Sequence, residues 1–169
     1  DKTGTLTANK LHFNAVYPVG VDQSTCERLL ADFAASATAT NKTTEALIDG
    51  LQGAKRKVVD EVPFASIRKW SALAFNDTTP AATGDPSKGV PTTGVYVLGA
   101  MEMLRDELTL PPKAEAQLKQ WSDEGLRVLV FAGNTDATTL HDAQGEVKLP
   151  PLTLLGLVSL TDELRPHLQ

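Results

Sequence analysis

Residues 126–132 read Leu-Arg-Val-Leu-Val-Phe-Ala, and residues 152–160 read Leu-Thr-Leu-Leu-Gly-Leu-Val-Ser-Leu. Short apolar runs rich in branched side chains are typical of buried β-strands. A polar connection at residues 134–151 joins the two runs. Strands that follow one another along the chain favour a mostly antiparallel sheet over a doubly wound parallel one.

Further strands are expected at four stretches that are apolar or alternate between apolar and polar residues: 10–19, 57–64, 70–75 and 93–98. Residues 76–91 are rich in Pro, Gly, Thr and Asp and predict a long hairpin loop between the last two strands. The sequence therefore predicts an α+β fold with a largely antiparallel, six- or seven-stranded twisted sheet that is flanked by helices.

Three helices are expected. The first begins at a cap provided by Asp22 or Ser24, and its apolar positions recur at helical steps: Cys26, Leu29, Leu30, Phe33 and Ala37. The second begins at Thr43 or Thr44 and has Gly53 as its stop. The third opens at Pro111 and Pro112, buries Ala114, Leu118 and Trp121, and ends at Gly125.

Composition excludes several classes of protein. The 169 residues carry 16 Lys and Arg against 21 Asp and Glu, a net charge of −5, which argues against nucleic-acid binding. Cys26 is the single cysteine, so an intramolecular disulfide is excluded. No apolar run approaches the roughly 18 residues of a membrane helix. The chain opens at Asp1 without a leader pattern, which predicts a piece of a longer protein. Its length predicts a single domain, and the piece is expected to be monomeric.

The first seven residues, Asp-Lys-Thr-Gly-Thr-Leu-Thr, carry the most specific chemistry. The Asp1 carboxylate can attack a phosphoryl group to form an aspartyl phosphate, and Lys2 can meet the phosphate charge. Phosphatases of the haloacid-dehalogenase group usually place a second Asp two residues further on, as general acid and base. Here that residue is Thr3, which cannot transfer a proton at neutral pH, so the phosphoenzyme is expected to persist.

This heptapeptide resembles the signature of the P-type ATPases, a family of ion pumps, and the resemblance covers the whole chain. It implies that Asp1 is the phosphorylated residue of the intact pump. It also implies that Mg²⁺ binds there, through Asp1 and the Thr3 backbone. The segment at 161–166 resembles the family's Asp-Pro-Pro-Arg hinge, with both prolines replaced, and carries over Asp162 and Arg165.

The resemblance divides the chain into three parts. Residues 1–9 would hold the phosphorylation motif and a first hinge strand, 10–158 a nucleotide-binding domain, and 159–169 a second hinge strand. The two ends are expected to lie side by side, because they would connect one inserted domain to the rest of the pump.

Interior segments imply an ATP pocket. The stretch Asn-Lys-Thr-Thr-Glu-Ala-Leu at 41–47 resembles the family's Pro-Thr-Glu-x-Ala-Leu helix start, and Glu45 is carried over as acceptor for the adenine amino group. Phe64 and Lys69 resemble the Phe-Ser-x-x-x-Lys stretch, whose ring stacks on adenine and whose Lys lines the pocket. Arg127 matches a Gly-Leu-Arg segment whose Arg reaches the phosphates.

One departure concerns the pocket mouth. Family members usually have Lys-Gly-Ala where this chain has Leu98, Gly99 and Ala100. Gly99 is carried over, whereas Leu98 removes a charge-assisted phosphate contact of about 1.5–3 kcal/mol unless Arg68, Lys69 or Arg127 replaces it. Weak nucleotide binding is expected.

The leading hypothesis is the cytosolic ATP-binding domain of a P-type cation pump, working with Mg²⁺ and with the pump's remaining phosphorylation, actuator and membrane domains at the cytoplasmic face of the membrane. The isolated piece is expected to bind nucleotide without turnover. Two alternatives remain open: a stand-alone dehalogenase-class phosphohydrolase, and a structural module whose pocket binds no nucleotide. The resemblance is greatest to the calcium-type pumps of actinobacteria.

Overall fold

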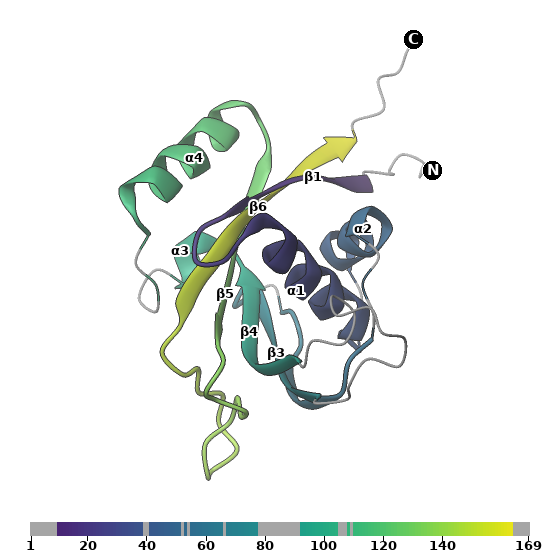
Figure 1. Cartoon of the computed structure of the whole chain (residues 1–169), viewed down its shortest axis with the longest axis vertical. Helices are drawn as coiled ribbons and strands as arrows, with labels where there is room; N and C mark the ends of the chain where they lie inside the picture. Colours follow the sequence, from purple (N-terminus) through teal and green to yellow (C-terminus); the bar gives the residue numbers. More distant parts are fainter. Residues whose placement is uncertain are drawn as a thin grey trace.

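The computed structural model describes residues 10–38, 41–51, 53, 55–65, 67–77, 92–104, 108 and 110–163 (Figure 1). Four expected site residues lie outside the described residues: Asp1, Lys2, Thr3 and Arg165. The same holds for residues 78–91, most of the expected hairpin loop.

The described part of the chain folds around one twisted, six-stranded sheet in the order β1-β6-β5-β4-β3-β2. Each neighbouring pair of strands is antiparallel. The strands are β1 (Lys10–Pro18), β2 (Val58–Val62), β3 (Trp70–Asp77), β4 (Thr92–Gly99), β5 (Arg127–Asn134) and β6 (Thr153–Glu163). The α+β fold with a largely antiparallel sheet, predicted from consecutive apolar runs, is confirmed.

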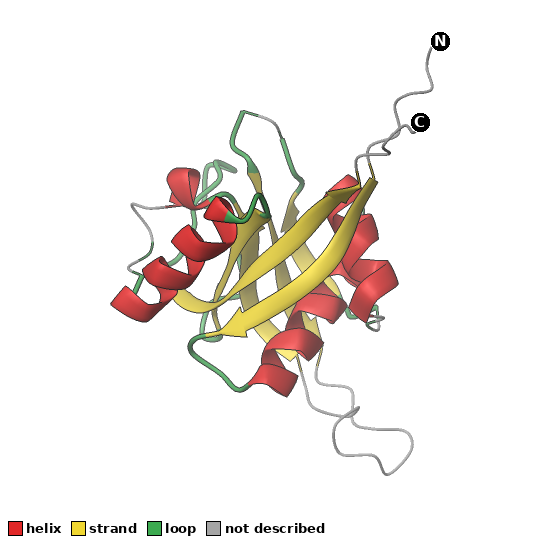
Figure 2. Cartoon of the chain, turned by 90° about the horizontal axis from the view of Figure 1, so that it is seen from above, coloured by secondary structure: helices red, strands yellow, loops and turns green. Residues whose placement is uncertain are grey.

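Helices cover both faces of this sheet (Figure 2). The helices α1 (Gln23–Ser36) and α2 (Lys42–Leu51) pack on one face, and α3 (Met101–Leu104) and α4 (Pro112–Asp123) on the other. Successive side chains of a strand point to opposite faces, so each central strand supplies both cores. For example, Leu98 and Phe131 belong to the α1 side, whereas Val97 and Val130 belong to the α4 side.

The core on the α1 side has an aromatic cluster at its centre. The ring of Phe131 contacts Phe33 edge to face at 5.8 Å and stacks on Tyr96 at 5.9 Å. On the α4 side, the next residue of β5 is the small Ala132. Burial of a large apolar side chain stabilises a fold by about 1.5–3 kcal/mol. The aromatic cluster therefore anchors α1, and through it α2, to the centre of the sheet.

Local signals set most helix ends. The side chain of Asp22, not Ser24, caps α1 by accepting from the Thr25 N–H at 3.2 Å. Ala37, which was expected on the apolar face of this helix, follows the helix in extended conformation and still packs against the same core. At the end of α4, Gly125 adopts φ +85°, and the Leu126 N–H donates to the Trp121 carbonyl at 3.0 Å. This is the glycine-terminated helix end that the sequence predicted.

The two ends of the described chain lie side by side, because Lys10 pairs with Glu163 across β1 and β6. Figure 1 shows the two strands leaving the domain in the same region. β6 runs without interruption from Thr153 to Glu163, so the expected boundary between residues 158 and 159 falls inside one strand. Residues 1–9 and 164–169 are outside the described residues.

Candidate nucleotide pocket

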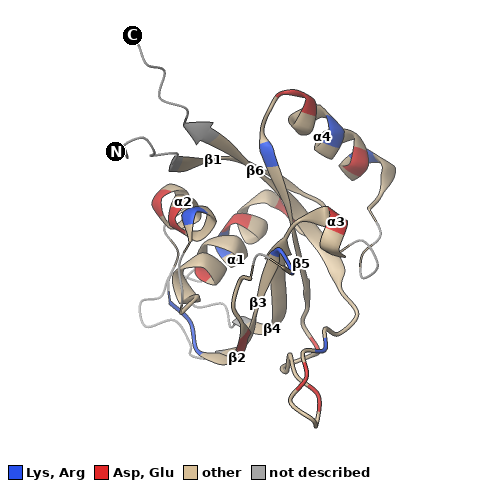
Figure 3. Ribbon diagram, turned by 180° about the vertical axis from the view of Figure 1, so that it is seen from behind, with Lys and Arg blue, Asp and Glu red and all other residues tan. Residues whose placement is uncertain are grey.

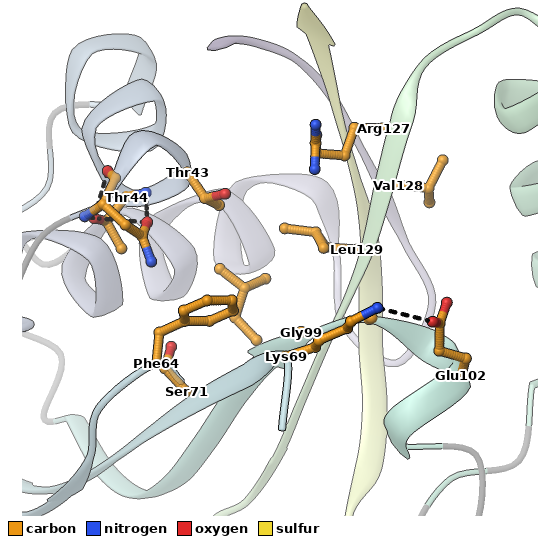
Figure 4. A pocket seen from close by; sticks show the side chains of 13 residues that line it. Thr43, Thr44, Phe64, Lys69, Ser71, Gly99, Glu102, Arg127, Val128 and Leu129 are labelled. Carbon is orange, nitrogen blue, oxygen red and sulfur yellow. Dashed lines mark hydrogen bonds and ion pairs between the residues drawn. The ribbon is translucent and has the colours of Figure 1, made fainter. Parts of the chain in front are cut away.

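A pocket of about 400 Å³ lies on the α1–α2 side, where the start of α2, the segment before β3, the end of β4 and the start of β5 meet (Figure 4). Its lining residues come from segments far apart in the sequence: Asn41, Thr43, Thr44, Phe64, Lys69, Ser71, Leu98, Gly99, Ala100, Glu102, Arg127, Val128 and Leu129. Four expected site residues are among them, namely Phe64, Lys69, Gly99 and Arg127. The fold therefore brings most of the described candidates to one place.

Phe64 offers an exposed aromatic face. It follows β2, and 48% of its surface is accessible, which is high for the largest apolar residue of the pocket. In Figure 4 its ring lies over the space between α2 and β5. Large rings are usually buried, so a ring left at a pocket edge is suited to stack on a flat ligand.

Lys69 is held by its backbone at the pocket mouth. Its φ is +58°, which is unusual for a residue with a side chain. Its N–H donates to the Ala65 carbonyl at 2.7 Å, and its own carbonyl accepts from the Ala100 N–H at 3.0 Å. Its ammonium lies 3.6 Å from the carboxylate of Glu102, and both side chains are more than half exposed.

Gly99 is required by the close approach of β4 to β3. A Cβ atom there would lie 2.2 Å from the Trp70 Cβ and 2.7 Å from the Lys69 carbonyl oxygen. Real Cβ atoms do not come so close to backbone, so a side chain at residue 99 would push the Lys69 segment away. Gly99 thus fixes the shape of the pocket mouth.

Arg127 supplies the second cation. It begins β5, is exposed, and lines the pocket opposite α2 (Figure 4). Arg68, the other expected substitute for the missing Lys, does not line the pocket. Its guanidinium lies 5.5 Å from the centre of the Trp70 ring and donates to the Pro63 carbonyl at 2.7 Å. Of the three cations expected to compensate for Leu98, Lys69 and Arg127 therefore line the pocket.

Leu98 forms an apolar part of the lining. It is 4% exposed and belongs to the core on the α1 side. Val128 and Leu129 of β5 extend this surface. The pocket consequently combines an apolar surface and an aromatic ring with two cationic side chains. This arrangement suits a ligand that has a flat base at one end and an anion at the other.

The start of α2 forms the uncharged wall. Asn41 and Thr44 cap the helix reciprocally, because the Thr44 N–H donates to Asn41 Oδ1 at 2.9 Å and the Asn41 N–H donates to Thr44 Oγ1 at 2.8 Å. Thr44 is 4% exposed and faces the pocket, whereas Glu45 is exposed and does not line it. When the family pattern is aligned on Ala46-Leu47, its Glu position falls on Thr44.

Asp162 pairs with Leu11 in the antiparallel ladder between β6 and β1. Among the expected site residues whose side chains the structure describes, Glu45 is the one that does not line the pocket. Sequence reasoning missed Asn41, Thr43, Ser71 and Glu102 as lining residues. For Asn41, the capping pattern three residues before Thr44 was an available signal.

A second polar cluster fastens the 134–151 connection to the edge of the sheet. Both oxygens of Asp60 on β2 lie 2.9 Å from His141 Nδ1, and Asp60 also accepts from the Leu140 N–H at 2.7 Å. Burial favours a raised pKa for Asp60, but the hydrogen bonds from His141 and from the Leu140 and Glu61 N–H groups outweigh it and lower the pKa. This cluster does not contribute to the pocket lining.

Comparison with known proteins relates the chain to ATP-driven transporters. No family model matches it. It is 29% identical over 98% of its length to the calcium-transporting ATPase CtpE of Mycobacterium tuberculosis, and 28% identical to a probable cation-transporting ATPase of Streptococcus pneumoniae. In each case it spans 18% of the relative's length. None of the described helices is long and apolar enough to cross a membrane.

Solved structures agree on the fold. A crystal structure of a zinc-transporting PIB-type ATPase matches 98% of this chain with a TM-score of 0.55 and 20% sequence identity, and the match spans 21% of that protein. A second crystal structure of a zinc-transporting PIB-type ATPase, in another state, matches 92% of this chain with a TM-score of 0.56 and 18% identity. The chain is therefore similar, over nearly its whole length, to one segment of cation-transporting P-type ATPases.

Proposed function

We propose that this chain is the ATP-binding domain of a P-type cation pump. The observation that carries the proposal is the convergence of Phe64, Lys69, Gly99 and Arg127 on one pocket, although they come from separate segments of the sequence. The similarity to cation-transporting ATPases over 98% of the chain supports it.

In this proposal adenine stacks on the ring of Phe64 and lies against the apolar surface formed by Leu98 and Leu129. The phosphates extend towards Lys69 and Arg127, where a charged donor contributes about 1.5–3 kcal/mol per hydrogen bond to a charged group. The base edge meets the start of α2. There Thr43 offers a hydroxyl in place of the carboxylate that was expected from Glu45.

In the intact pump the bound ATP would deliver its γ-phosphate to Asp1, with Lys2 meeting the phosphate charge. Mg²⁺, held by the Asp1 carboxylate and the Thr3 backbone, would stabilise charge on the transferring phosphoryl group. Asp162 and Arg165 would belong to the hinge. Because those steps need domains beyond this chain, the chain alone would bind nucleotide without turning it over. The similarity to CtpE favours calcium as the transported ion.

The test is a calorimetric titration of the full chain with ATP, with Phe64→Ala as the variant. Loss of a stacking ring worth about 1–3 kcal/mol should weaken binding roughly 5- to 150-fold. Ile67→Ala is the matched control, because Ile67 lies in the same loop, is 84% exposed and does not line the pocket. Equal affinities for all three proteins would contradict the proposal.

Leu98 favours a second candidate, a structural module that binds no nucleotide. It replaces the charged residue that the family usually has, and it is buried in the core. No heat of binding at millimolar ATP would support this module. Hydrolysis of ATP or a phosphate ester by the chain, abolished by Asp1→Ala, would instead point to the phosphohydrolase.

A further inference from the structure

We propose that Glu102 is a specificity-determining residue of this pocket. Its carboxylate competes with ligand phosphates for Lys69, and it shifts the selectivity of the pocket towards nucleotides whose phosphate charge is neutralised by Mg²⁺ and away from the free polyanions. This inference rests on the proposed nucleotide-binding function and specifies which charge state of the ligand the site accepts.

The geometry places the competing groups together. Glu102 Oε2 lies 3.6 Å from Lys69 Nζ, and both residues line the pocket. Figure 4 shows the two side chains pointing towards each other at the pocket edge, on the side away from Thr43 and Thr44. With 53% of Lys69 and 70% of Glu102 exposed, the pair is weak and solvated. A phosphate can therefore displace the carboxylate from Lys69.

The backbone keeps Glu102 close to any phosphate that Lys69 holds. The Ala100 N–H donates to the Lys69 carbonyl at 3.0 Å, and α3 begins at the next residue. On the other side, the Lys69 N–H is bonded to the Ala65 carbonyl at 2.7 Å. Because the Ala100 N–H ties the start of α3 to the Lys69 backbone, the backbone of Glu102 stays near Lys69, and its carboxylate moves away from Lys69 Nζ only as far as the side chain can rotate.

The charge balance of the lining makes this one carboxylate important. Among the described lining residues, Lys69 and Arg127 are cationic and Glu102 alone is acidic. Elsewhere the charges of both signs are interspersed, as Figure 3 shows along α2 and α4. Free ATP carries more negative charge than its Mg²⁺ complex, so repulsion from the Glu102 carboxylate weakens the binding of free ATP more than the binding of the complex. Salt screens this repulsion.

The experiment compares the full chain with Glu102→Gln by calorimetric titration with adenosine, with ATP in EDTA, and with ATP in excess Mg²⁺. The variant should bind Mg²⁺-free ATP about 3- to 10-fold more tightly, and Mg²⁺-complexed ATP with a smaller gain. Adenosine has no phosphate, so its affinity should not change. In a Lys69→Met background, Glu102→Gln should raise the affinity for Mg²⁺-free ATP by less, because the ammonium for which the carboxylate and the phosphates compete is absent.

Glu115→Gln is the matched control, since Glu115 is an exposed acid in the first turn of α4 and does not line the pocket. The inference is overturned if Glu102→Gln leaves ATP affinity unchanged, weakens it, or raises adenosine affinity equally. If wild type and variant bind neither adenosine nor ATP, the proposed function fails, and the inference fails with it. If adenosine binds, but the ratio of adenosine affinity to ATP affinity is the same in wild type and Glu102→Gln, only the inference fails.

Discussion

Two ion pairs of this domain differ in their exposure to solvent: the pair of Arg56 with Asp32 is buried, and the pair of Lys69 with Glu102 is exposed. Arg56 Nε lies 2.9 Å from Asp32 of α1, with side chains only 10% and 4% exposed. The Arg56 N–H also donates to Ser36 Oγ at 2.7 Å, so the residue fastens its segment to the helix twice. Lys69 and Glu102 stand 3.6 Å apart, and both are more than half exposed.

The difference lies in what each pair loses when it opens. A buried charge that is separated from its partner keeps its desolvation penalty, so the Arg56 contact resists opening. The exposed pair exchanges its partner for water or for a ligand at little cost. A binding site needs the second kind of pair, because its cation must be available to another anion.

The largest effect is expected for Arg56→Ala. It should lower the free energy of unfolding by about 2–4 kcal/mol. The loss stays below the full cost of an isolated buried charge, because Arg28 still faces Asp32 at 3.5 Å. Urea unfolding measures the loss. Lys69→Met is the matched variant at the exposed pair and should change stability by less than about 1 kcal/mol. Equal losses in the free energy of unfolding for the two variants would contradict the difference between the buried and the exposed ion pair.

An intermediate effect is expected for Asp60→Asn at the partly buried cluster with His141. Removal of the charge weakens the hydrogen bonds from His141 and the Leu140 N–H, so stability at pH 7 should fall by about 1–2 kcal/mol. The measurement is urea unfolding between pH 3 and pH 7.

The pH dependence has a defined sign. The pKa of Asp60 is lowered from 3.8 in the folded chain, so its contribution is present above that value and is lost as pH falls through the lowered native pKa. The gap in stability between wild type and Asp60→Asn should therefore begin to narrow below about pH 4 and close as pH falls through the lowered native pKa of Asp60. Asp123→Asn, an exposed control on α4, should show no such gap. A gap that persists unchanged at pH 3 would refute the assignment.

The sheet could be predicted because its strands carry their own signals. The apolar runs at 126–132 and 152–160 became β5 and β6, since strands covered on both faces need apolar residues at consecutive positions. α4 was predictable from Pro112 and Gly125, which act locally at the helix ends. Boundaries were less accurate. α2 begins at Lys42, before the expected start. The four-residue α3 was not predicted, because a single helical turn is too short to show a helical repeat of apolar residues.

The site was predictable only in part, because its remaining contacts depend on strand pairing. Glu102 is brought to Lys69 by the pairing of Trp70 with Gly99, which no local pattern of the sequence predicts. The side of α2 that faces the pocket depends on the cap at Asn41. This cap turns Thr44 towards the pocket and leaves Glu45 exposed to solvent. The contact of Asp60 with His141 joins residues 81 positions apart, beyond the reach of any local pattern.

The most direct test of the central claim is an ATP titration of the isotope-labelled full chain, followed residue by residue by NMR. The claim predicts that the largest amide shifts occur around Phe64, Lys69, Leu98 and Arg127. It also predicts that α4 and the connection around His141 stay unchanged. No shifts at millimolar ATP, or the largest shifts on α4, would contradict the assignment of this pocket to a nucleotide.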